Sequence, residues 1–180
     1  MTYILFVLEL YQMNMIKKKN QIDFCFFINI NEFIHTMEHV AIMRKSWGLT
    51  QKILSGQKKI ESRWYKIKYP PWDKIKPGET IYLKDSGERV TIRTEVDRVI
   101  QFSNLTPEKV KEILYEYGKA DGLGIDEIPK FFEMFKDKKY CMLIFLKNPQ
   151  KIEPFEIDKI GFGAMSSWLT TEDVNKIRIR

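Results

Sequence analysis

Three charged side chains in one short segment, Lys58, Glu61 and Arg63, are of the types that bind phosphates and transfer protons. On an extended chain Glu61 and Arg63 point to the same face, while Lys58, just before the expected strand, can swing toward either face. Lys58 and Arg63 could then hold a phosphate, Arg63 through two hydrogen bonds. Glu61 could orient Arg63, accept a hydrogen bond from a base edge, or accept a proton. Spacing alone, however, favours an ordinary strip of solvated salt bridges along a strand.

The charged segment begins at Gly56, where a helix is expected to end and a strand to begin. Ser46 can cap a helix over about 47–55, whose leucines and isoleucine form one apolar face. Gly56 is suited to the left-handed conformation in which many helices end. The strand predicted over 59–66 then carries Glu61 and Arg63.

Short strands and inserted helices account for the rest of the chain. Val90–Phe102 is the clearest strand because apolar and polar residues alternate along most of it, and the turn residues 85–87 predict a hairpin before it. Pro107 stands in the favoured first position of a helix that Gly118 ends. Further strands are predicted over 38–43, 80–84, 140–146 and 151–157, and a second helix over 127–136. The long strand and the hairpin favour an α+β domain with a barrel-like sheet over a doubly wound fold.

The basic surplus of the chain lies outside its first 36 residues. Lys and Arg outnumber Asp and Glu by 30 to 24, and residues 1–36 hold three lysines and three acidic residues. The whole net charge of +6 therefore belongs to residues 37–180. A basic surplus on one compact unit favours anionic partners such as RNA, DNA or phosphates.

Residues 1–36 also differ in composition from the rest, with no Gly, Pro or Arg. A second methionine, Met37, stands just before the first predicted strand. We therefore expect the folded domain to span 37–180. Residues 1–36 are expected to be a dispensable extension or a misassigned start.

The first residues do not match a membrane segment or a secretion signal. The apolar run over 1–16 is interrupted by Glu9 and Gln12, and it falls short of the ~20 residues that a membrane span needs. It lacks the basic leader and the small-residue cleavage site of a signal peptide. The two cysteines, Cys25 and Cys141, lie too far apart in the sequence to indicate a disulfide framework. We expect no membrane partner and a reducing, cytoplasmic setting.

Residues 35–39 match H-x-x-E-H, a pattern of zinc metalloproteases. That chemistry requires both histidines on one face of a helix, with the glutamate beside them as general base. Here the pattern runs directly into the strand predicted over 38–43, and no third ligand is evident nearby. We interpret the match as chance and predict neither a metal nor a cofactor.

All four defined positions of the pattern G-x-K-x-x-E-x-R are matched in this chain, by Gly56, Lys58, Glu61 and Arg63. The segment resembles the signature of the ASCH family, and the resemblance extends over about Met37–Trp168. It implies a PUA-like β-barrel with inserted helices and a basic cleft lined by the signature. It also implies binding of RNA or a nucleotide-derived ligand, without naming that ligand or an oligomeric state.

One branch of the family resembles small amidohydrolases that remove the acetyl group from N4-acetylcytidine. The resemblance implies roles for the signature lysine, for a threonine at the position of Glu61, and for a later glutamate. This chain keeps Lys58, and its later acid could be Glu112 or Glu116. A threonine can be an activated nucleophile, whereas the carboxylate of Glu61 would have to work differently. A hydrolase acting on a modified nucleoside or on RNA, centred on Lys58 and Glu61, is therefore the alternative to a binding module. A protein-interaction module is the third possibility.

The tryptophans bear on RNA binding because unpaired bases stack on aromatic rings, although a tryptophan in a small domain usually lies in the core. Trp168 follows a small-residue loop over 161–167 and could cover a cleft. Trp72, between prolines and a basic run, is predicted to anchor a loop. The residues predicted to contact RNA or a nucleotide are Lys45, Trp47, Gly56, Lys58, Glu61, Arg63, Trp64 and Trp168.

Overall fold

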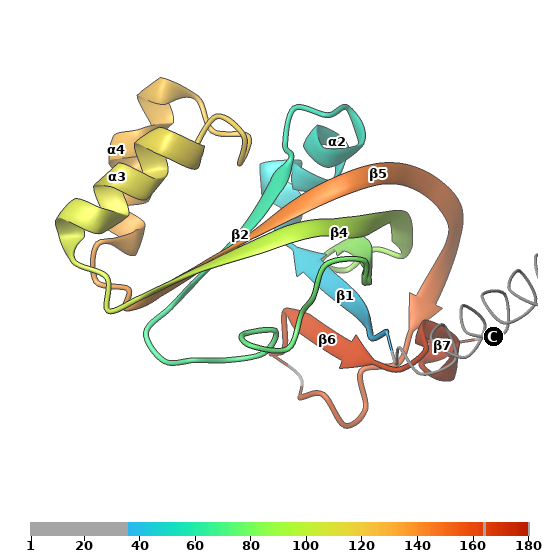
Figure 1. Cartoon of the computed structure of the whole chain (residues 1–180). Coiled ribbons are helices and arrows are strands. Elements are labelled where there is room, and N and C mark those ends of the chain that lie inside the picture. Colours follow the sequence, from blue (N-terminus) through green and yellow to red (C-terminus); the bar gives the residue numbers. More distant parts are fainter. Residues whose placement is uncertain (1–35, 164, 180) are drawn as a thin grey trace, which may run out of the picture. The chain divides into compact units, whose positions relative to one another are not determined.

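A curled, mixed β-sheet is the frame of the domain (Figure 1). The computed structural model describes residues 36–163 and 165–179. The strands are β1 (Glu38–Met43), β2 (Ile60–Tyr65), β3 (Thr80–Asp85), β4 (Val90–Ser103), β5 (Tyr140–Ile157), β6 (Trp168–Thr171) and β7 (Arg178–Ile179). They are ordered β2-β5-β4-β3-β1-β6, with β7 added to β5. β1 and β3 are parallel, and the other neighbouring strands are antiparallel.

The two longest strands, β4 and β5, give the sheet its curl (Figure 1). Their pairing register shifts at three places along β4, and such bulges bend a strand and increase its twist. The two strands predicted over 140–146 and 151–157 are in fact one continuous strand. The bend allows the first part of β5 to pair with β2 and its last residues to pair with β7.

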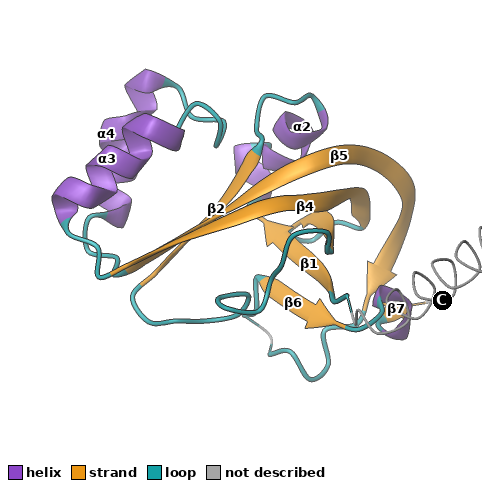
Figure 2. Cartoon of the chain, in the orientation of Figure 1, coloured by secondary structure: helices purple, strands orange, loops and turns teal. Residues whose placement is uncertain are grey.

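Helices lie against this sheet at two places (Figure 2). α3 (Pro107–Tyr117) and α4 (Ile128–Phe135) pack side by side at one end of it. α3 begins as predicted, with Pro107 in its first turn and the Thr106 side chain accepting a hydrogen bond from the Lys109 amide. The other helix, α2 (Leu49–Leu54), precedes β2. Short 3-10 turns complete the structure, η1 (Lys45–Trp47), η2 (Ile125–Glu127) and η3 (Val174–Lys176).

α2 is shorter than the helix predicted over 47–55. The chain first makes the turn η1 and then passes through Gly48, whose φ of 59° lies in the left-handed region. Gly48, and not Ser46, is therefore the residue before the helix. At the other end Gly56 has a φ of 77°, which confirms the predicted left-handed residue where the helix ends.

Successive residues of β5 contribute to two different hydrophobic clusters. Met142 and Ile144 point into the curl of the sheet, where they pack with residues of β1, β3 and β4 and with Trp72. Cys141 and Leu143 point to the opposite face, which α3 and α4 cover. This is the two-residue alternation of a strand that is buried on both faces. Cys141 is fully buried there, and the prediction that Trp72 anchors a loop is confirmed by its burial.

The predicted α+β class with a barrel-like sheet is confirmed by this arrangement. Residues 1–35 lie outside the described residues, so the extension over 1–36 and the domain boundary near Met37 stay predictions. Within the described ranges, none of the helices has the length and apolar character needed to cross a bilayer.

The zinc-protease pattern does not form the helix that its chemistry requires. Glu38 and His39 belong to strand β1, and His35 lies outside the described residues. His39 is buried, and its imidazole lies 2.9 Å from the Glu79 carboxylate and 3.1 Å from the Thr170 hydroxyl. Burial lowers the pKa of His39. Over residues 36–163 and 165–179, no three His, Cys, Asp or Glu side chains are grouped so that they could hold a metal ion.

Candidate functional site

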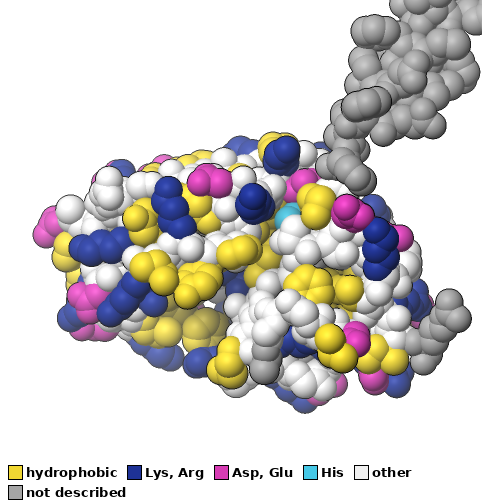
Figure 3. All heavy atoms as spheres, turned by 90° about the horizontal axis from the view of Figure 1, so that it is seen from below, with side chains coloured by type: hydrophobic (Ala, Val, Ile, Leu, Met, Phe, Trp, Pro, Cys, Tyr) yellow, Lys and Arg dark blue, Asp and Glu magenta, His cyan; other side chains and the backbone are white. Residues whose placement is uncertain are grey.

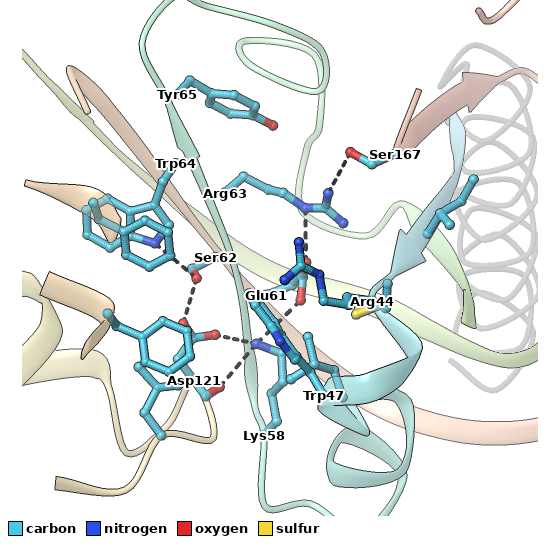
Figure 4. A pocket seen from close by; sticks show the side chains of 16 residues that line it. Arg44, Trp47, Lys58, Glu61, Ser62, Arg63, Trp64, Tyr65, Asp121 and Ser167 are labelled. Atoms are coloured by element: carbon cyan, nitrogen blue, oxygen red, sulfur yellow. Dashed lines mark hydrogen bonds and ion pairs between the residues drawn. The ribbon is translucent and has the colours of Figure 1, made fainter. Parts of the chain in front are cut away.

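The signature segment lines a pocket of about 270 Å³ that lies between α4 and the β1–α2 connection (Figure 4). Glu61 and Arg63 are contributed by β2, and Lys58 by the turn before it. That turn is closed by a hydrogen bond from the Lys58 amide to the Lys52 carbonyl, at 2.9 Å. The left-handed Gly56 lets the chain leave α2 and enter this turn.

Lys58 is the buried cation of the pocket, with 4% of its side chain exposed. Its Nζ is paired with the Asp121 carboxylate, donates to the Asp121 carbonyl at 3.1 Å, and lies 3.4 Å from Glu61 Oε2. Burial by itself disfavours the ammonium, but the negative charges of Asp121 and Glu61 outweigh it and raise the pKa of Lys58. Lys58 is therefore a fixed positive charge at neutral pH and cannot act there as a general base.

Asp121 contacts both Lys58 and strand β2. Its Oδ2 accepts a hydrogen bond of 2.6 Å from the Ser62 hydroxyl. The loop that carries it is docked at the start of β2, because the Ala120 carbonyl accepts hydrogen bonds from the amides of Lys59 and Ile60. The next residue, Gly122, has a φ of 82°, and a Cβ there would lie 3.1 Å from the Lys58 side chain. The left-handed backbone conformation therefore favours glycine at position 122, and the close approach to Lys58 adds to that preference.

The later acidic residue that lines the pocket is Asp121, and not Glu112 or Glu116. Glu112 and Glu116 are exposed on α3 and do not line the pocket, because they lie on the face of α3 that is turned away from the sheet. The sequence signal that could have indicated Asp121 is an acidic residue inside the Gly-rich loop over 118–124, directly after a helix.

Arg63 is held by three groups on different elements. Its Nε lies 2.9 Å from Glu61 Oε1, and its Nη1 donates to the Ser167 hydroxyl at 3.2 Å. Its guanidinium carbon lies 5.0 Å from the centre of the Trp168 ring, which is within cation–π range. Glu61 therefore sits between two cations, Lys58 and Arg63, and fixes the position of the arginine.

Aromatic side chains form the apolar walls of the pocket. Trp64 is stacked on Phe135, with ring centres 4.7 Å apart and planes 7° from parallel. Trp47 meets Phe131 edge to face at 5.8 Å. Arg44, an exposed residue at the rim, places its guanidinium 4.8 Å from the centre of the Trp47 ring.

Comparisons with known proteins show which solved structures share this fold. No protein-family model and no curated protein matches the sequence. Among solved structures, a tyrosine-to-phenylalanine mutant of the ASCH protein from Zymomonas mobilis covers 73% of this chain and 88% of its own, with a TM-score of 0.52 and 19% identity. The chain has the fold of an ASCH domain. Weaker similarities include an ASCH domain from Lactobacillus crispatus (TM-score 0.38, 13% identity, 60% of this chain and 78% of that one). The N-terminal domain of Staphylothermus marinus McrB is another (TM-score 0.41, 15% identity, 65% and 75%).

The fold brings five of the eight residues predicted from the sequence to the pocket, which are Trp47, Lys58, Glu61, Arg63 and Trp64. Gly56 shapes the turn before β2 and does not line the pocket. Trp168 does not cover it either. That residue is 5% exposed at the start of β6, and its indole N–H donates to His39.

Lys45 is the third predicted residue that does not line the pocket. It is exposed and paired with Glu88, on the hairpin between β3 and β4. Its neighbour Arg44 lines the pocket instead. Arg44 is still in an extended conformation, whereas Lys45 begins the turn η1, so the two side chains diverge.

One carboxylate oxygen of the pocket is incompletely satisfied, although the lining side chains carry an excess of positive charge. Three lining side chains are cations (Arg44, Lys58 and Arg63) and two are carboxylates (Glu61 and Asp121), so positive charge is in excess. Glu61 is 4% exposed, and its Oε2 has no well-aligned hydrogen-bond donor among the residues that the structure describes. Buried oxygens of this kind usually accept a hydrogen bond from the protein, from water or from a ligand.

Proposed function

We propose that this pocket binds RNA through one unpaired nucleotide, with the base inside and the phosphate at the rim. The observation that carries the proposal is Glu61 Oε2. This buried oxygen belongs to a residue that lines the aromatic-walled pocket, and it lies 3.4 Å from Lys58 Nζ but accepts no well-aligned hydrogen bond from the described residues. The amino and imino groups of nucleobases are donors of the required kind, and carboxylates accept hydrogen bonds from them.

The size of the pocket supports a single base as the occupant. Its volume of about 270 Å³ lies just below the range of about 300–1,000 Å³ that is usual for drug-sized ligands. Proteins that recognise RNA sequences mostly bind unpaired bases, which stack on aromatic side chains and present their edges to polar groups. Trp47 and Trp64 supply such aromatic surface beside Glu61.

The rim supports a phosphate next to that base. Arg44 is exposed there, and Arg63 is oriented by Glu61 and Ser167. Arginine binds phosphate oxygens through its planar set of N–H donors. The buried Lys58 is fully engaged with Asp121 and Glu61, so in this proposal it holds Glu61 in place rather than contacting the phosphate.

Replacing Arg44 with alanine should lower the affinity for single-stranded RNA by about 5- to 10-fold, for many sequences alike, because a phosphate contact acts through charge. Fluorescence anisotropy with a labelled single-stranded RNA of mixed sequence, at several salt concentrations, measures the effect. The slope of log affinity against log salt should flatten by about one.

Lys45→Ala is the matched control for the Arg44 experiment. It removes the same charge from the adjacent residue, which pairs with Glu88 and does not line the pocket. We expect a much smaller change than for Arg44→Ala. Equal losses for the two variants would show that only the general charge of this surface matters and would contradict a phosphate site at Arg44.

A hydrolase acting on a modified nucleoside is the second candidate, and one contact favours it. The Ser62 hydroxyl donates to the Asp121 carboxylate at 2.6 Å, inside the pocket and beside the Lys58 ammonium. A hydroxyl becomes a better nucleophile when an adjacent base accepts its proton, and the acceptor here would be Asp121. Glu61, however, provides no hydroxyl at the position where the amidohydrolases have threonine.

We therefore expect weak or absent removal of the acetyl group from N4-acetylcytidine. The release of cytidine, followed by chromatography, measures this activity. Rapid turnover that disappears in both Lys58→Ala and Ser62→Ala would contradict the expectation and make the domain an enzyme. The serine variant is informative because it leaves Lys58 and Glu61 in place.

A further inference from the structure

A second pocket adjoins the first on the side of β6. It has a volume of about 820 Å³ and is lined by Tyr65, Tyr69, Pro70, Gly161, Phe162, Gly163, Met165, Ser166, Ser167, Trp168 and Thr170. Figure 3 shows the molecule from below, where a hollow lies among hydrophobic, basic and other side chains. The lining residues carry no formal charge, so this pocket suits the uncharged part of a ligand.

The two pockets share a wall. Tyr65 and Ser167 line both of them. Arg63 stands at this wall, since it lines the first pocket, donates to the Ser167 hydroxyl at 3.2 Å, and lies over Trp168 of the second pocket. A ligand that extends from one pocket into the other must therefore pass close to the Arg63 guanidinium.

We propose that the second pocket binds the neighbouring nucleotide of the same RNA strand, so that the site takes a dinucleotide step with the linking phosphate at Arg63. The inference rests on the proposed function of the first pocket. A single-stranded nucleic acid alternates uncharged bases with anionic phosphates. The site offers a matching order, with the uncharged second pocket, then the Arg63 guanidinium, and then the aromatic wall of the first pocket.

The aromatic side chains of the second pocket fit a base. Tyr69 is 56% exposed, so its ring is accessible for stacking without any change in the core. Aromatic stacking accepts any base, so this subsite adds affinity rather than sequence preference. The shared Tyr65 can donate a hydrogen bond at neutral pH, because burial raises the pKa of its hydroxyl to about 12.

Calorimetric titration with ribonucleotides of increasing length tests the second subsite. The probes are the four ribonucleoside 5′-monophosphates and then 5′-phosphorylated ribodinucleotides that carry the best-binding base at either end. For the wild type, we expect the better dinucleotide to bind about tenfold more tightly than the monophosphate, which is the gain from one stacked base.

Tyr69→Ala should remove this gain and leave the affinity for the monophosphate unchanged, whereas Tyr69→Phe should keep it. Tyr115→Ala is the matched control, because Tyr115 is a similarly exposed tyrosine (53%) that lines neither pocket. It should leave both affinities unchanged.

Each failure of this experiment has its own meaning. If the monophosphate binds but no dinucleotide binds more tightly, or if Tyr69→Ala leaves the gain intact, the second subsite is wrong and the single-nucleotide function stands. If neither monophosphates nor dinucleotides bind, the proposed function fails and the second subsite fails with it.

Discussion

Replacing Lys58 with methionine is expected to lower the free energy of unfolding by about 3–5 kcal/mol, the usual cost of removing one partner from a buried ion pair. The Lys58 ammonium is the charge that compensates the buried Asp121 and Glu61 carboxylates. Without it Asp121 loses its cationic partner and Glu61 keeps only Arg63, so a buried carboxylate must stay charged without compensation or take up a proton. Urea unfolding at pH 7, followed by circular dichroism, measures the loss.

Lys59→Met is the matched control for Lys58. It removes the same side chain one residue later, where the lysine is exposed, and surface changes of this kind usually stay within about 0.5 kcal/mol. Adding Asp121→Asn to Lys58→Met should recover part of the lost stability, because one buried charge is then gone. A loss below about 1 kcal/mol for Lys58→Met would be too small for a buried ion pair and would count against this network as a source of stability.

The pH dependence of stability provides a second readout of the same pair. The pKa of Lys58 is raised in the folded state above its ordinary value of 10.5, so the unfolded chain loses this proton first. The contribution of the pair is therefore complete below about pH 10.5 and is lost as the pH rises through the raised pKa. The difference in stability between the wild type and Lys58→Met should accordingly shrink above pH 10.5 and stay constant near neutrality.

Arg63→Ala is expected to reduce the affinity for single-stranded RNA by about 10- to 100-fold at low salt, from the loss of a charge-assisted phosphate contact of about 1.5–3 kcal/mol. Arg63 is fixed by Glu61, Ser167 and the Trp168 ring, so its donors are already oriented for a ligand. The loss should be similar across RNA sequences and should flatten the salt dependence by about one unit of slope. Anisotropy measurements at several salt concentrations give both quantities.

Two further variants separate the effects of charge, of the planar arginine donors and of the Glu61 carboxylate on RNA binding. Arg63→Lys should restore only part of the affinity, because lysine keeps the charge and loses the planar set of donors. Glu61→Gln should change the preference among RNA bases more than the salt slope, because it alters the group proposed to contact the base edge.

Arg98→Ala is the matched control for Arg63. Arg98 is an exposed arginine on β4 that lies near Asp97 and lines neither pocket. The proposed site would be wrong if Arg63→Ala and Arg98→Ala weakened RNA binding equally, or if the wild type bound no RNA at all. The signature would then be an internal salt-bridge network of the ASCH fold.

Several features of this protein were determined by short stretches of sequence, because the forces that produce them act between near neighbours. Gly56 adopts the left-handed conformation after α2, and Thr106 with Pro107 starts α3. The alternation along β2 places Glu61 and Arg63 on one face, where they pair. These outcomes depend on backbone sterics and on the geometry of one helix or strand, so they could be predicted from the residues themselves.

Other features were decided only by the tertiary structure. β5 is one continuous, bent strand because it pairs with β4 along most of its length. Asp121 reaches Lys58 because its loop docks on β2, and Arg44 rather than Lys45 faces the pocket because the chain turns just after β1. The partners in these contacts lie far apart in the sequence, or depend on where a turn directs a side chain. Their meeting is set by packing of the whole sheet, which no local pattern of residues encodes.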